Sequence, residues 1–208
     1  MFRRILGIAL VALGLVSLAC DDATGPEGVG TDDLKFLQLP PGAPPLVVQT
    51  ASFWARTDDN REVRMYFRPR PGESDSSEFL RFRVDEGSLA RRPNGSTFAA
   101  VDSILITLTV VDLQRLIVDF QPSGLRFSQS RPARLKIEYQ NADHDFDDDG
   151  DVDSNDEALE ERFSIWRQEI PGAPWFELGT VRRDDIDEIE GDIFGFTNHA
   201  LAYRSGRQ

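Results

Sequence analysis

Apolar and polar residues alternate with a period of two through most of the chain after residue 50. Successive side chains of a β-strand point to opposite faces of its sheet, so this pattern predicts strands with one buried and one solvated face. Turn signals such as Pro71-Gly72 and Pro171-Gly172 separate the runs. Many short strands divided by turns predict an antiparallel sandwich of about eight to ten strands. The expected strands cover residues 52–55, 63–68, 80–84, 104–110, 116–120, 134–139, 163–167, 175–181 and 193–203.

Only one stretch favours a helix, a turn or two over residues 155–162. We therefore expect an all-β domain, an antiparallel β-sandwich over residues 46–204, followed by a tail at 205–208. About 160 residues are enough for one domain with a sizeable apolar core.

The first twenty residues read MFRRILGIALVALGLVSLAC, a basic start followed by an apolar run that is too short for a comfortable membrane span. This is the pattern of a secretory signal peptide. The only cysteine of the chain, Cys20, ends it. The segment Ser17-Leu18-Ala19-Cys20 resembles the lipobox of bacterial lipoproteins, which implies lipidation of Cys20 and a protein anchored in the cell envelope outside the cytoplasm. The alternative is an ordinary signal peptide cut near Ala19, which would leave a free thiol.

Residues 21–45 are rich in Asp, Gly, Thr and Pro. Such a composition favours a solvated chain over a packed one, so these residues are predicted to form a flexible tether between the membrane and the domain.

The chain is strongly acidic, with a formal net charge of −13 at pH 7. Removal of the signal peptide would take away Arg3 and Arg4 and no acidic residue. Nucleic-acid binding depends on neutralising phosphates, so this charge argues against it. It argues equally against adhesion to an anionic membrane surface, so the lipid alone would hold the protein at the membrane.

The segment 145–156 reads DFDDDGDVDSND and forms a candidate calcium loop. Calcium takes about 6–8 oxygen ligands and needs several carboxylates that converge on one point. Gly150, at loop position 6, permits the sharp turn because glycine enters positive φ without steric cost. The aspartates occupy positions 1, 3, 5, 7, 9 and 12: Asp145, Asp147, Asp149, Asp151, Asp153 and Asp156. The alternative interpretation is a solvated acidic run.

This spacing resembles the EF-hand loop, and most closely its dockerin variant, which ends in Asp. The resemblance implies side-chain ligation at five of the positions and a backbone carbonyl ligand from Asp151. It also implies that Val152, at position 8, anchors the loop to the core. A dockerin needs two such loops and an EF-hand needs an entering helix. One loop between two expected strands therefore favours a structural Ca²⁺ over a signalling sensor.

A second resemblance concerns the domain itself. The stretch Gly87–Leu89, the turn Pro122–Phe127 and the terminal FTNHALAY from Phe196 are similar to the ZU-type β-sandwich of ankyrins and netrin receptors. The similarity covers roughly residues 80–203. Members of that family are structural and protein-interaction modules, which implies the same role here.

No catalytic motif is present, and the two histidines, His144 and His199, lie outside any such pattern. The leading hypothesis is a non-catalytic binding or scaffolding module. Two alternatives are an accessory protein that binds a glycan or a protein through the calcium loop, and a hydrolase that uses carboxylates. Exposed aromatics beside the loop, such as Trp54, Tyr66 or Trp166, would favour the glycan. Carboxylates about 5–9 Å apart in a deep cleft would favour the hydrolase.

Overall fold

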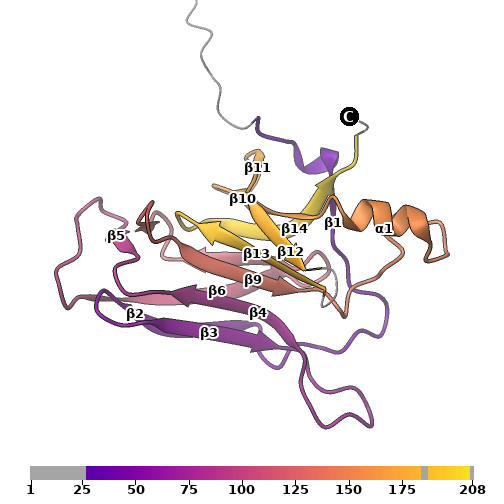
Figure 1. Ribbon diagram of the computed structural model, residues 1–208, viewed down its shortest axis with the longest axis horizontal. Coiled ribbons are helices and arrows are strands. Elements are labelled where there is room, and N and C mark those ends of the chain that lie inside the picture. The colour runs from indigo at the N-terminus through magenta and orange to yellow at the C-terminus, as the bar shows by residue number, and fades with distance from the viewer. Residues whose placement is uncertain (1–26, 184–186, 207–208) are drawn as a thin grey trace, which may run out of the picture.

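The structure, a computed structural model, describes residues 27–183 and 187–206 (Figure 1). These residues form fourteen strands, one α-helix and one short 3-10 helix at Thr31–Asp33. The helix α1 covers Ser154–Glu160. The strands are β1 (Leu34–Phe36), β2 (Thr50–Arg56), β3 (Arg61–Tyr66), β4 (Glu78–Val84), β5 (Leu89–Arg91), β6 (Ser103–Asp112), β7 (Ile117–Gln121), β8 (Arg126–Phe127), β9 (Ala133–Glu138), β10 (Ser164–Gln168), β11 (Trp175–Glu177), β12 (Thr180–Arg183), β13 (Glu188–Ile193) and β14 (Asn198–Arg204).

Two large sheets face each other, and every strand pairing in them is antiparallel. The seven-stranded sheet has the order β11-β10-β14-β7-β6-β2, with β1 paired to β14. The five-stranded sheet has the order β12-β13-β9-β4-β3, and β5 pairs with β8 in a small separate sheet. The predicted all-β antiparallel sandwich with one short helix is confirmed. The strands outnumber the eight to ten expected because several have only two to four residues, too few for a visible alternation.

On strands such as β6, alternation buries one side between the two sheets, whereas β10 and β14 are buried on both sides. On β6, Ile106, Leu108 and Val110 are buried, and the residues between them face outward. Phe82 of β4 lies at the centre of an aromatic cluster that joins the sheets, with its ring 5.1 Å from Phe120 of β7 and 5.5 Å from Phe196. Edge-to-face and tilted arrangements at such distances are the favoured packing of aromatic rings.

Ion pairs cover the outer face of the five-stranded sheet. Lys136 of β9 is nearly buried, and its Nζ lies 2.8 Å from Glu78, 2.5 Å from Glu138 and 3.0 Å from Glu188. Arg81 also pairs with Glu78. Burial alone would lower the pKa of Lys136, but the three carboxylates outweigh it and raise the pKa, so this ammonium stays charged.

The prediction of a flexible tether over residues 21–45 is wrong from Val29 onward. Val29 forms a bridge with Trp175, and β1 pairs with β14 in register Leu34 to Arg204. Leu34 and Phe36 are buried, and the Phe36 ring lies 5.3 Å from that of Trp175. The alternation in Leu34-Lys35-Phe36 is too short to be noticed in a polar stretch, yet it pairs with the C-terminal part of β14. The domain therefore begins before residue 46.

The predicted signal peptide, Cys20 and residues 21–26 lie outside the described residues, as do residues 207 and 208 of the expected tail. Ser205 is tied to the fold, since its N–H donates to the carbonyl of Asp33 at 2.9 Å. None of the helices in the described part of the chain has the length and apolar character required to cross a membrane.

Candidate metal centre

The aspartate loop joins β9 to β10 and leads directly into α1, which projects from one side of the sandwich next to β1 (Figure 1). Phe146, at loop position 2, is buried, and its ring lies 4.9 Å from Phe163. The hydroxyl of Tyr203 on β14 donates to the carbonyl of Phe146 at 2.9 Å. Tyr139 donates to Glu160 of α1 at 2.7 Å. The loop is thus fastened to the core at its start and, through α1, at its end.

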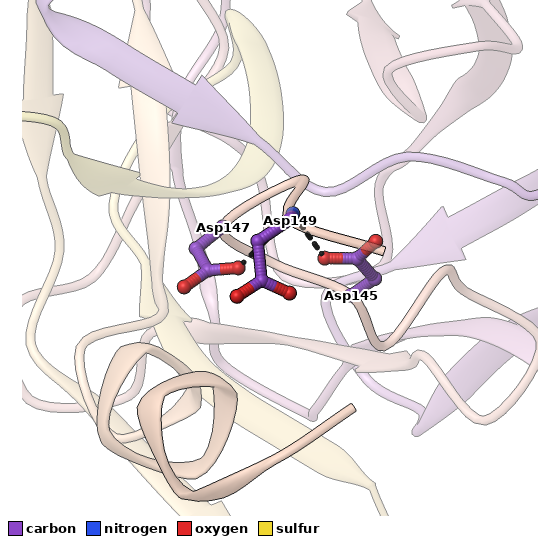
Figure 2. Close-up of side chains that lie close together, drawn as sticks. All are labelled: Asp145, Asp147 and Asp149. Carbon is purple, nitrogen blue, oxygen red and sulfur yellow. Dashed lines mark hydrogen bonds between the residues drawn. The ribbon is translucent and has the colours of Figure 1, made fainter. Parts of the chain in front are cut away.

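Three carboxylates converge at the start of the loop. Oxygens of Asp145, Asp147 and Asp149 all lie within 4.8 Å of one another (Figure 2). The turn that gathers them is fixed by Asp145, whose two oxygens accept from the N–H of Asp149 at 3.0 Å and of Gly150 at 2.9 Å. Gly150 has φ +97, the left-handed conformation that glycine adopts freely. The turn predicted at this glycine is therefore present.

The grouped charges repel one another. The pKa of Asp147 lies above its ordinary value, first because desolvation disfavours the charged carboxylate and then because Asp149, Asp156 and Asp145 add negative charge. A divalent cation among these oxygens would remove that repulsion. The donors are hard carboxylate oxygens, which suit a hard cation such as calcium or magnesium.

Asp153 and Asp156 point to other partners. Asp153 is the N-cap of α1, and its Oδ1 accepts from the N–H of Asn155 at 2.7 Å. Asp156 is buried and accepts three backbone N–H groups, from Phe146 at 2.6 Å, Asp147 at 3.2 Å and Asp153 at 2.9 Å. These bonds, led by the one from Asp153, lower the pKa of Asp156. Of the five predicted side-chain ligands, the structure brings together the first three.

Asp151 and Val152, at loop positions 7 and 8, are both exposed. The N–H of Asp151 donates to Asp149 at 3.0 Å, and its side chain faces solvent, as the prediction of a carbonyl ligand at this position requires. The expectation that Val152 anchors the loop is wrong, because Val152 is 70% exposed. Phe146 is the anchor instead. Its position between two aspartates, as the only aromatic residue of the loop, was the available signal.

Lys35 is a neighbour of the loop that the sequence did not indicate. Its Nζ lies 3.2 Å from Asp148, and both side chains are about half exposed or more. An exposed ion pair contributes little to stability, about 0–1 kcal/mol. It nevertheless shows that β1, assigned to the tether from sequence, borders the aspartate loop.

The aromatic residues singled out from the sequence, and His199, are buried, half-buried or far from the aspartate loop. Trp166 is buried and Tyr66 is half-buried, so neither forms an exposed aromatic platform. Trp54 is 59% exposed, but it lies on β2, at the edge of the seven-stranded sheet. Three strands separate β2 from β10, which follows the aspartate loop. His199 is fully buried, as expected of a packed strand residue.

No protein-family model, curated protein or solved structure matches this chain. The resemblances to the lipobox, the EF-hand loop and the ZU-type sandwich therefore rest on the residues quoted for them and stay predictions.

Proposed function

We propose that this chain is a calcium-binding, lipid-anchored β-sandwich of the cell envelope that serves as a non-catalytic binding or scaffolding module. The observation that carries the proposal is the convergence of Asp145, Asp147 and Asp149 within 4.8 Å in a loop that turns at Gly150. Backbone hydrogen bonds to Asp145 hold these like charges close together, and a divalent cation would offset their mutual repulsion.

Calcium suits this loop better than magnesium. Magnesium demands near-octahedral geometry, keeps several waters and uses only one or two carboxylates, whereas calcium accepts several carboxylates and carbonyls in flexible geometry. Asp145, Asp147 and Asp149 would be ligands, with the carbonyl of Asp151 as a fourth. Asp153 and Asp156 complete the proposed set of ligands only if a bound ion draws their carboxylates away from the backbone N–H groups that now donate hydrogen bonds to them.

The proposed role of the ion is structural. A calcium sensor works by changing the angle between two helices. Here the loop is entered from β9, and the one helix beside it has seven residues. An ion would therefore fix the connection between β9 and β10 without opening a groove.

Thermal unfolding of the protein with calcium and with a chelator tests the metal site. A ligand that binds only the folded state at 100 times its Kd adds about 2.7 kcal/mol to the free energy of unfolding. Asp145→Ala should abolish the calcium-dependent rise in Tm, whereas the control Asp151→Ala should keep it, because Asp151 contributes only its carbonyl. Identical midpoints with calcium and chelator would end the proposal of a metal site.

Hydrogen exchange distinguishes a structural ion from a switch. Chelation should deprotect residues near 141–162 and leave β6 and β9 protected. Newly exposed apolar surface in the calcium-bound form would contradict the structural role.

The proposed anchor is tested separately through Cys20. The wild-type protein should incorporate labelled fatty acid and partition into detergent, and Cys20→Ser should do neither. Recovery of all the wild-type protein in the soluble fraction, with a free N-terminus at Asp21 or later, would refute the anchor.

A further inference from the structure

Exposed apolar side chains gather on one edge of the seven-stranded sheet. Six of the ten large apolar side chains that are exposed among the described residues lie in segments 47–54 and 101–111, on or beside β2 and β6. Trp54 is 59% exposed, and its cross-strand partner Leu105 is 44% exposed. Scattered apolar side chains are normal on a surface, but a cluster that includes an exposed tryptophan marks a binding surface.

Six outward residues of β2 and β6, in three neighbouring cross-strand pairs, form a strip without charge. Thr50 pairs with Thr109, Ser52 with Thr107 and Trp54 with Leu105. We call these six residues the β2–β6 strip. In a chain of which 28% is charged, and whose other sheet is covered by ion pairs, a strip of uncharged residues is distinctive. Charge complementarity therefore favours a neutral ligand.

Hydroxyl groups fill the middle of the strip. The hydroxyl oxygens of Ser52 and Thr107 lie 2.8 Å apart, and those of Thr50 and Thr109 lie 3.3 Å apart. Each hydroxyl has one donor and two acceptor sites, so every pair retains free acceptors for a ligand. Along the strand the rows repeat about every 6.8 Å. An extended ligand that itself carries hydroxyl groups matches this arrangement.

A hollow of about 470 Å³ opens beside Trp54 between the edge strands β2 and β3, a volume within the usual range for small-ligand sites. Its charged lining residues are already paired, Arg56 with Asp58 at 3.0 Å, Arg61 with Asp59 at 2.7 Å and Glu62 with Arg64 at 2.6 Å. The hollow thus presents planar hydrogen-bonding groups of both signs with no unpaired charge among these lining residues.

We propose that the β2–β6 strip and the hollow beside Trp54 bind a neutral polysaccharide, with the apolar face of one sugar ring stacked on the indole and its hydroxyls bonded to the Ser and Thr row. A protein partner fits less well, because apart from Trp54 the strip consists of Ser, Thr and Leu, which are under-represented among the residues that dominate protein interfaces. The inference rests on the proposed function only in taking the domain as a binding module. The strip lies three to four strand spacings, roughly 14–19 Å, from β10, the strand that follows the aspartate loop.

Retention of the full chain on cellulose, chitin and starch granules, with polygalacturonate as an anionic probe, tests the proposal. We expect retention on at least one neutral polysaccharide and none on polygalacturonate. Trp54→Ala should weaken retention at least about tenfold, the effect of removing an aromatic anchor. Trp54→Phe should keep it, and so should the control Val181→Ala, which truncates an equally exposed apolar side chain on β12 of the other sheet. Thermal melts verify that each variant folds.

Thr107→Val separates a sugar from an apolar partner. The change removes one hydroxyl and adds a methyl group, so it should weaken binding of a polysaccharide and leave or strengthen binding of an apolar surface. Tryptophan fluorescence gives an independent readout, because Trp166 and Trp175 are buried and Trp54 is accessible to acrylamide. A soluble oligosaccharide of the retained polymer should protect Trp54 from quenching.

Three results would overturn the proposal. They are no retention on any neutral probe, retention that Trp54→Ala leaves unchanged, and sedimentation showing that the strip instead joins two copies of the chain. The same assays with chelator keep the two proposals apart. If calcium does not change the melting temperature but the protein is still retained on a polysaccharide, only the metal site is refuted. If calcium raises the melting temperature but no polysaccharide retains the protein, only the polysaccharide site is refuted.

Discussion

Acid should destabilise this fold through His199. The side chain lies on β14, fully buried, with Nδ1 3.0 Å from the carbonyl oxygen of Thr197 and its ring 4.9 Å from Phe120. Within the described residues Nε2 has no hydrogen-bond partner. Burial lowers the pKa of His199 to about 3, because a charged imidazolium would be desolvated and its second N–H would remain unbonded.

The sign and size of the effect follow from linkage. The ordinary pKa of histidine is 6.5, so between pH 6.5 and 3 the unfolded chain binds a proton that the folded chain does not. Stability is unaffected above pH 6.5 and falls as the pH drops through this window. At pH 5 the free energy of unfolding is lower by about 2 kcal/mol, since each pH unit below 6.5 costs about 1.4 kcal/mol. That is a substantial part of the 5–15 kcal/mol typical of a whole domain.

Denaturant unfolding at pH 7.5 and pH 5 measures this effect. Between the two values wild type should lose about 2 kcal/mol more than His199→Leu, which has no group to titrate there. Comparing the change with pH, rather than the absolute stability, removes the cost of the lost bond to Thr197. The control Leu201→Ile, in the buried part of the same strand, should keep the wild-type pH dependence. Equal losses in wild type and His199→Leu would show that the folded protein accommodates a charged His199, and the reasoning from burial would fail.

Two further changes test the long-range packing. Lys136→Met should lower the free energy of unfolding by about 3–5 kcal/mol in denaturant titrations, because it leaves Glu78, Glu138 and Glu188 without the ammonium between them. A loss below 1 kcal/mol would mean that the nearby arginines suffice. A chain that begins at residue 27 should melt like the longer protein, whereas one that begins at residue 38 should melt at a lower temperature and expose Trp175, which packs against Phe36. Equal midpoints would restore the idea of a tether.

Local patterns in the sequence determined the fold class and the outline of the aspartate loop. Alternation along β4, β6 and β9 dictates which side of each strand is buried, because successive side chains point to opposite faces. The spacing of Asp145, Asp147 and Asp149 around Gly150 likewise predicts a turn that gathers carboxylates, since the turn is made by neighbouring residues.

Tertiary structure decided what depends on contacts between distant residues. Leu34-Lys35-Phe36 looks like part of a solvated segment until β14, far along the chain, offers it an edge to pair with. Phe146 rather than Val152 anchors the loop because Phe163 and Tyr203 lie on its side.

The tryptophans show the same division. Trp54 and Trp166 both lie in strand-like runs, yet one is exposed and the other buried. The difference arises because β2 ends its sheet, whereas Trp166 packs with Trp175 and with residues of β1 and β14 in a second core cluster. A periodic sequence fixes which residues share a face of a strand, but the order of the strands decides what, if anything, covers that face.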